Sequence, residues 1–247
     1  MKKGKRMSKI NFKPGNMIYP LPAVMVSCGD IETESNIFTV AWTGTICTNP
    51  PMAYISVRPE RYSYDMIKKS GEFVINLTTE QLIKATDFCG VRSGRDVDKW
   101  LKCNLTKEKA DTVKCPLIAE SPVNIECKVT EIKELGSHHM FIADVTAVHV
   151  DESYMDKNNS FHLNDSNLLA YSHGSYFGLG NELGTFGYSI RKKKAAAKSS
   201  QKAEKKSHTD KKRIVKEKKS MSQKVMAKQN IKHSKTTVKN KRIKKHK

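Results

Sequence analysis

An all-β fold with short flanking helices is the architecture that this sequence predicts. Runs rich in β-branched and aromatic residues outnumber helix-like runs, and they are bounded by Gly, Pro and Asp turn signals. Helices of about 10–15 residues do not alternate with these runs, which disfavours a doubly wound parallel sheet. An antiparallel barrel is therefore the predicted arrangement of the strands.

Six runs have the composition of strands. The first ends at the turn pair Gly29-Asp30, and the third begins after the double proline at 50–51 and stops before Arg58-Pro59. Residues 136–139 lie between the last two runs and are interpreted as a hairpin connection. The predicted strands are 23–28, 37–42, 53–57, 73–77, 123–132 and 140–150.

Two short helices complete the predicted fold. The segment 62–69 has a helical composition, and Gly71 follows it as a typical helix stop. A second short helix is expected near Lys99, where Asp96 is available to cap its first turn.

Charge divides the chain into two parts. Residues 191–247 contain 24 basic and 3 acidic residues, whereas the other 190 residues contain 21 basic and 22 acidic ones. The sequence therefore predicts a near-neutral domain over residues 8–190 and a lysine-rich tail over 191–247, and it excludes a wholly basic nucleic-acid-binding domain. Because the tail has no aromatic residue, proline or glycine, we expect it to be disordered on its own.

The compartment indicated by the sequence is the cytoplasm. No membrane span is expected, because the longest charge-free stretch, 37–57, carries Asn49, Pro50 and Pro51 in its middle. The six cysteines have neither zinc-site nor disulfide-scaffold spacing, so we expect reduced thiols and no metal ligand. Met1 to Lys9 lacks the apolar run of a signal peptide, and Met7 is an alternative start.

Three segments carry residue types suited to binding a ligand. Segment 35–44 mixes hydroxyls, a Trp and a glycine at a strand end. This composition is suited to binding a flat heterocycle, but an ordinary barrel strand can have it too. Segment 56–65 supplies two arginines and a serine at a helix start, which suits a phosphate but also a solvated surface loop. Segment 88–99 places glycines, a serine and cations together, which suits a phosphate but also a structural loop.

These segments together resemble those of a known family. The patterns Asn-x-x-Thr-x-Ala-Trp-x-Gly, Arg-Pro-x-Arg-Tyr-Ser and Cys-Gly-x-x-Ser-Gly-Arg-x-x-Asp-Lys occur in this order. In this respect the chain resembles the flavin reductase-like, FMN-binding split-barrel family, and within it the flavoredoxin group. The resemblance implies a six-stranded antiparallel Greek-key split barrel that forms a homodimer, with FMN near the subunit interface. The lysine-rich tail departs from the family pattern.

The resemblance also implies which residues bind FMN. The isoalloxazine ring and ribityl chain would contact Asn36, Thr39, Ala41, Trp42, Thr43 and Gly44. Cys89 and Gly90 would lie close to the ring or the ribityl chain. The phosphate would contact Arg61, Ser63, Ser93, Gly94 and Lys99.

The predicted activity is that of an NAD(P)H-dependent flavin reductase, with NADH or NADPH as the reductant. Flavin chemistry belongs to the cofactor, so no catalytic triad is required, and His138 and His139 are weak catalytic candidates. A flavoredoxin-like electron carrier that does not oxidise NAD(P)H itself is the alternative. A further alternative is a flavoprotein tethered to nucleic acid or another polyanion through the tail 191–247.

Overall fold

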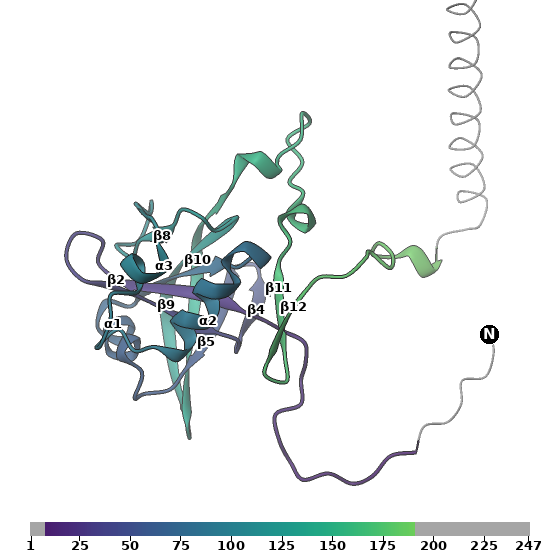
Figure 1. The fold of residues 1–247 in the computed structure, drawn as a ribbon, viewed down its shortest axis with the longest axis horizontal. Coiled ribbons are helices and arrows are strands. Elements are labelled where there is room, and N and C mark those ends of the chain that lie inside the picture. Colours follow the sequence, from purple (N-terminus) through teal and green to yellow (C-terminus); the bar gives the residue numbers. More distant parts are fainter. Residues whose placement is uncertain (1–7, 191–247) are drawn as a thin grey trace, which may run out of the picture. The chain divides into compact units, whose positions relative to one another are not determined.

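The computed structural model describes residues 8–190, most of which form an antiparallel β structure with short helices around it (Figure 1). The predictions for the tail 191–247 lie outside the described residues. Residues up to Asn181 belong to one compact unit, and the described part of a second unit contains the 3-10 turn η4 (Tyr188–Ile190). In the described part of the chain no helix is long and apolar enough to cross a membrane.

The main sheet contains seven strands, and all its neighbouring strands are antiparallel in the order β3-β2-β6-β9-β10-β5-β4. Its strands are β2 (Val24–Gly29), β3 (Ser35–Val40), β4 (Thr43–Thr48), β5 (Pro51–Val57), β6 (Glu72–Leu77), β9 (Val123–Leu135) and β10 (His138–Val150).

One bent strand closes this sheet into a barrel. The two edge strands, β3 and β4, are separated only by Ala41 and Trp42, and the amide of Ser56 on β5 donates to the Trp42 carbonyl at 2.8 Å. Counted as one strand, β3 and β4 reduce the ring to six strands. Since β6 returns beside β2 after the run β2, β3–β4, β5, the topology is a Greek key, and the predicted six-stranded split barrel is confirmed.

Smaller elements surround the barrel. The short strands form a three-stranded sheet, β1-β11-β12, and a two-stranded sheet, β7-β8. These elements are β1 (Leu21–Pro22), β7 (Lys107–Glu108), β8 (Leu117–Ile118), β11 (Leu169–Ser172), β12 (Ser175–Gly178), α1 (Tyr62–Ser70), α2 (Ile83–Val91), α3 (Lys99–Cys103), η1 (Glu80–Leu82), η2 (Glu152–Tyr154) and η3 (Leu163–Ser166).

The barrel core follows the alternation of the strands. On β5 the side chains of Ala53, Ile55 and Val57 point inward, and they alternate with half-buried side chains. They pack with Phe73 of β6 and Phe141 of β10, both fully buried. Burying each such side chain stabilises the fold by about 1.5–3 kcal/mol, so this alternation fixes which face of β5 points into the barrel.

The structure corrects the sequence-based boundaries at two turns. The predicted strand 37–42 runs instead over Ser35–Val40, because the chain bends at Ala41 and Trp42 to join the opposite edge. The hairpin turn is shorter than predicted, since His138 and His139 already pair with Leu135 and Glu134 as the first residues of β10.

The helices begin and end through recognisable capping contacts. α1 ends at Gly71, which adopts the left-handed conformation (φ 68°) and donates its amide to the carbonyl of Ile67, as the sequence predicts. α3 is capped by Asp98, not by Asp96, because the Asp98 carboxylate accepts from the amide of Leu101 at 3.2 Å.

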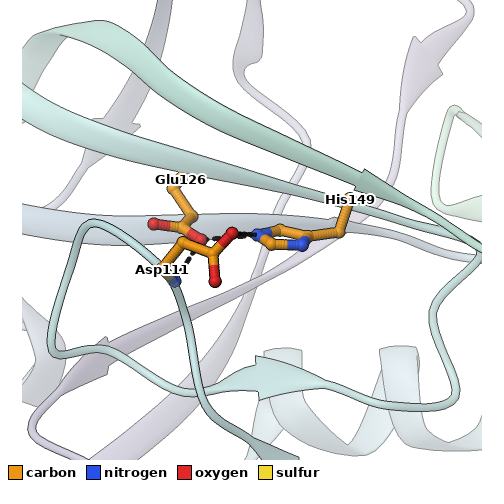
Figure 2. A group of neighbouring side chains, drawn as sticks. All are labelled: Asp111, Glu126 and His149. Atoms are coloured by element: carbon orange, nitrogen blue, oxygen red, sulfur yellow. Dashed lines mark hydrogen bonds and ion pairs between the residues drawn. The ribbon is translucent and has the colours of Figure 1, made fainter.

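A buried carboxylate holds the loop before β8 against the hairpin formed by β9 and β10 (Figure 2). Glu126 is fully buried and accepts from the amides of Asp111 (2.8 Å), Thr112 (2.6 Å) and Val113 (3.2 Å), and it lies 2.6 Å from His149 Nε2. Asp111, Glu126 and His149 could each offer one metal ligand atom. Because the Glu126 oxygens already accept these hydrogen bonds, we interpret the group as an anchor for the loop.

The same contacts keep Glu126 ionised. Burial opposes ionisation, but hydrogen bonds from Thr112, Asp111 and His149 outweigh it and lower the pKa of Glu126 to about 2. The folded-state pKa lies below its ordinary value of 4.5. The contribution of ionised Glu126 to the stability of the fold is therefore fully present above about pH 4.5, and it is lost as the pH falls toward 2.

Replacing Glu126 by Gln tests this anchor. The amide leaves buried N–H donors without an acceptor, so we expect the free energy of unfolding to fall by at least about 2 kcal/mol at pH 7. We also expect a smaller loss near pH 2, where part of the wild-type carboxylate is protonated. Urea unfolding at both pH values measures the difference. Glu131→Gln, at an exposed position of the same strand, is the matched control, and equal effects of the two substitutions would contradict the anchor role.

Candidate ligand-binding cleft

Two adjoining hollows form one continuous cleft beside β3 and α2. Their volumes are about 400 and 300 Å³. The lining residues that they share are Phe38, Thr39, Arg58, Arg61 and Gly90. Because both hollows include these residues, they are the two ends of a single elongated site, which we call the β3–α2 cleft.

Close contact between β3 and α2 builds the floor of the cleft. The Thr39 hydroxyl of β3 donates to the carbonyl of Thr86 on α2. Gly90 lies opposite the same threonine, and a Cβ added there would approach Thr39 Cβ to 3.3 Å. A glycine at this position therefore lets the end of α2 approach the strand and leaves main chain accessible at the floor.

The larger hollow is lined by aromatic side chains. The rings of Trp42 and His138 are in contact in a tilted arrangement, with centroids 4.3 Å apart and an interplanar angle of 37°. Ala41, Tyr171 and Tyr176 also line this hollow. A planar heterocycle fits such a surface, because aromatic walls and small side chains admit a ring without steric conflict.

His138 is set up to be neutral at pH 7. Burial lowers the pKa of its imidazole, and the charge of Arg58 lowers it further, while Glu60 opposes the shift and Arg61 adds to it. A neutral imidazole at the aromatic end has one nitrogen that accepts a hydrogen bond and one that donates.

The smaller hollow is rich in cations. Glu60 is the carboxylate in its lining, and the cations there are Arg58, Arg61, Arg92, Arg95 and Lys99. Glu60 pairs with Arg58 at 3.3 Å. Within residues 8–190, Arg61 and Arg92 form no ion pair, so this end of the cleft carries positive charge that suits an anion.

Lys99 lies under the cation-rich end and is almost completely buried, with 3% of its surface exposed. Its ammonium donates to the carbonyls of Ile37 (2.8 Å) and Cys89 (3.0 Å). Burial lowers the pKa of Lys99, and the neighbouring Arg61 adds to the shift while Cys89 opposes it. No carboxylate of the described chain lies within ion-pair distance of this ammonium, so a bound anion would favour its charged form.

The loop after α2 closes against β3 and α1. Asn36 Nδ2 donates to Ser63 Oγ at 2.8 Å, and both side chains are buried. Gly94 packs over this pair, and a Cβ added there would lie 2.7 Å from Tyr62 Cδ1. The loop can approach this closely only because residue 94 has no side chain, and the Ser93 hydroxyl, which also lines the cleft, accepts from the Arg95 amide at 3.2 Å.

Most residues that the sequence analysis selected line the cleft together, although they come from four separate segments. They are Asn36, Thr39, Ala41, Trp42, Arg61, Ser63, Cys89, Gly90, Ser93, Gly94, Lys99 and His138.

Three selected residues lie outside the cleft lining. The Thr43 hydroxyl donates to the carbonyl of Tyr54 at 2.6 Å, and Gly44 packs against the ring of Tyr54. His139 points its Nδ1 toward the hydroxyl of Tyr64, at 2.7 Å, on the other face of β10.

The sequence analysis missed several residues that line the cleft. Arg58 and Arg92 stand within the motifs and carry the same charge as their selected neighbours, so the signal for them was present. Phe38 and Asp87 also line the cleft, and Tyr171 reaches it from β11. Nothing in the local sequence links Tyr171 to the cleft residues of β3, such as Thr39, which lie more than a hundred residues earlier in the chain.

The chain matches one protein family and is similar in sequence to several other proteins. Residues 16–180 match the family model described as the flavin reductase like domain. An uncharacterized protein of Archaeoglobus fulgidus is 30% identical over 139 residues, which cover 56% of this chain and 77% of that protein. An uncharacterized protein of Pyrococcus abyssi is 29% identical over 131 residues, which cover 53% of this chain and 74% of that protein.

Solved structures share the same fold. Flavoredoxin of Desulfovibrio vulgaris (Miyazaki F) aligns with a TM-score of 0.69 and 27% identity, covering 74% of this chain and all of that protein. Flavoredoxin from Methanosarcina acetivorans aligns with a TM-score of 0.67 and 26% identity, covering 75% of this chain and all of that one. An FMN-binding protein from Thermus thermophilus, at 22% identity and a TM-score of 0.60 over 73% of this chain and 99% of that one, shows the shared fold.

Proposed function

The chain belongs to the flavin reductase like family, and from this premise we propose that the β3–α2 cleft binds FMN and serves an oxidoreductase. The observation that carries the proposal is the division of one cleft into an aromatic end and a cation-rich end. FMN has the same division, because a flat heterocycle is joined through a ribityl chain to a phosphate. The names of the flavoredoxins and of the FMN-binding protein from Thermus thermophilus support the same ligand.

The donor set fits the phosphate of FMN. Arg61 has no ion-pair partner within residues 8–190, and Lys99 brings a buried ammonium under the same end. Ser93 and the main chain at Gly94 line this end as well. We assign Arg61, Ser93, Gly94 and Lys99 to the phosphate, and we assign Asn36 and Ser63 to holding β3 and α1 in place beneath it.

The aromatic end fits the isoalloxazine ring. Ala41 and Trp42 lie where the chain passes from β3 to β4, and the ring of Trp42 contacts that of His138. When bound, FMN would supply the redox chemistry, with NADH or NADPH as the proposed reductant. The protein would orient the ring and exclude water from its buried side, and the neutral His138 imidazole would accept a proton or donate a hydrogen bond there.

A homodimer is part of the proposal. Large apolar side chains are exposed on four strands, at Ile46, Leu135, Val148 and Phe177, and a second copy of the chain would cover such positions. Sedimentation equilibrium of the full chain tests this, since the mass of a single chain at micromolar concentration would contradict it.

The phosphate assignment predicts a difference between FMN and riboflavin. Replacing Arg61 and Lys99 together by Ala removes two charge-assisted contacts, each worth about 1.5–3 kcal/mol, so FMN should bind at least about tenfold more weakly. Riboflavin has no phosphate and should lose much less affinity. Flavin fluorescence titration measures both ligands, and Lys102→Ala on the exposed side of α3 is the matched control. Equal weakening of both flavins would remove Arg61 and Lys99 from the phosphate role.

Oxidation of nicotinamide separates the reductase from the carrier. A flavin reductase consumes NADH or NADPH with free FMN as the acceptor, and we expect the purified protein to do so. The absorbance at 340 nm (approximate, a property of the nicotinamide) follows the reaction. Tight FMN binding without oxidation of either nicotinamide would select the alternative function, a flavoredoxin-like electron carrier reduced by another protein.

The charge of residues 191–247 supports a second proposal, that this segment binds polyanions. Its 24 basic residues would release counterions from a nucleic acid, so affinity should fall steeply as salt rises. Deleting 191–247 should abolish binding of double-stranded DNA in a salt titration and leave FMN binding intact. Loss of FMN binding in the truncated chain would show that the division at residue 190 is wrong.

A further inference from the structure

α3 presents two side chains to the same residue of α2. Lys99 and Cys103 are four residues apart, so they lie on one face of this short helix. Lys99 Nζ donates to the Cys89 carbonyl at 3.0 Å, and Cys103 Sγ lies 3.9 Å from Cys89 Sγ. Two residues of α3 that lie one turn apart therefore contact Cys89, one at its main chain and the other at its thiol.

We propose that Cys89 and Cys103 form a reversible disulfide, a redox modification site beside the floor of the β3–α2 cleft. For the bond to form, the two sulfurs have to approach from 3.9 Å to a bond length of about 2.05 Å. The Lys99 contact already holds the two helices at this spacing. The proposal does not depend on which ligand the cleft binds.

The other four cysteines lack such a partner. Cys28, Cys115 and Cys127 are fully buried, and Cys47 is partly exposed on β4. Among the thiols of the described residues, the sulfurs of Cys89 and Cys103 are the pair that lies within hydrogen-bonding distance. Cys103 is partly exposed and Cys89 is 1% exposed, so an oxidant in solution reaches Cys103 first.

Hydrogen peroxide is the oxidant that we name for this reaction. The Cys103 thiolate attacks one peroxide oxygen, the O–O bond breaks, and the released hydroxide takes a proton to become the first water. The sulfur of Cys89 then attacks the sulfenic sulfur of Cys103, the S–O bond breaks, and the S–S bond forms. The leaving hydroxide takes the thiol proton of Cys89 as the second water. Two thiols thus lose two electrons and reduce one peroxide.

Burial makes this reaction slow at neutral pH. It raises the pKa of Cys89 to about 12, and Cys103 adds to the shift while the Lys99 ammonium opposes it. Burial also raises the pKa of Cys103, against the hydrogen bond to Cys89 and the charge of Lys99. Since the thiolate is the reacting species, the rate of disulfide formation should increase as the pH rises from 7 to 9.

Peptide mapping of the full chain tests the pair. After peroxide treatment at pH 8.5, two of the six cysteines should no longer react with an alkylating reagent. Reduction with dithiothreitol should make both react with it again. Trypsin cleaves between the two residues at Arg92, Arg95, Lys99 and Lys102, so the disulfide joins two separate peptides that mass spectrometry identifies. Cys103→Ser should abolish the linked pair, whereas Cys47→Ser, at the other partly exposed cysteine, should retain it.

A thermal measurement tests the geometry independently. Lys99→Met removes the polar contact between α3 and Cys89, and the disulfide would then hold the same two segments together. We expect oxidation to raise the melting temperature of this variant by several degrees and to leave the Lys99→Met, Cys103→Ser double variant unchanged. Oxidation of Cys103 beyond the sulfenic state without a link to Cys89, or an unchanged melting temperature of oxidised Lys99→Met, would overturn the proposal.

Discussion

The bend between β3 and β4 is the constraint on which the rest of the structure depends. At Ala41 and Trp42 the chain leaves β2 at one edge of the sheet and joins β5 at the other, and the hydrogen bond from Ser56 to the Trp42 carbonyl fixes this passage. Closing the barrel in this way fills its interior with side chains such as Phe73 and Phe141. The β3–α2 cleft therefore lies outside the barrel, against β3 and the helix α2 that packs on it.

Charge at the floor of the cleft is the second constraint. Burying an ammonium costs several kcal/mol unless partners compensate it, and Lys99 has two carbonyl partners but no carboxylate of the described chain. The unpaired Arg61 adds a second cation nearby within residues 8–190. An anion bound at this end, as proposed for the phosphate of FMN, would offset both charges.

Much of the fold could be predicted from local sequence because each element carries its own signals. Arg58-Pro59 marked the end of β5 at Val57, and Gly71 marked the end of α1. The path at Ala41–Trp42 could not be predicted in this way, because an ordinary strand and a strand that changes sheet edges have the same composition. The three segments that contain the motifs, 35–44, 56–65 and 88–99, hold most of the cleft lining, whereas Tyr171 joins it through the pairing of β11 with β1, which is a long-range contact.

The positions of Thr43, Gly44 and His139 show the limit of reasoning by motif. Thr43 and Gly44 follow the bend and face Tyr54, and His139 is turned to the opposite face from His138 by the alternation of β10.

Equilibrium dialysis of the purified full chain against FMN tests the central claim most directly. The proposed cleft predicts saturation at one FMN per chain, and a folded protein that retains no FMN at millimolar ligand would contradict it.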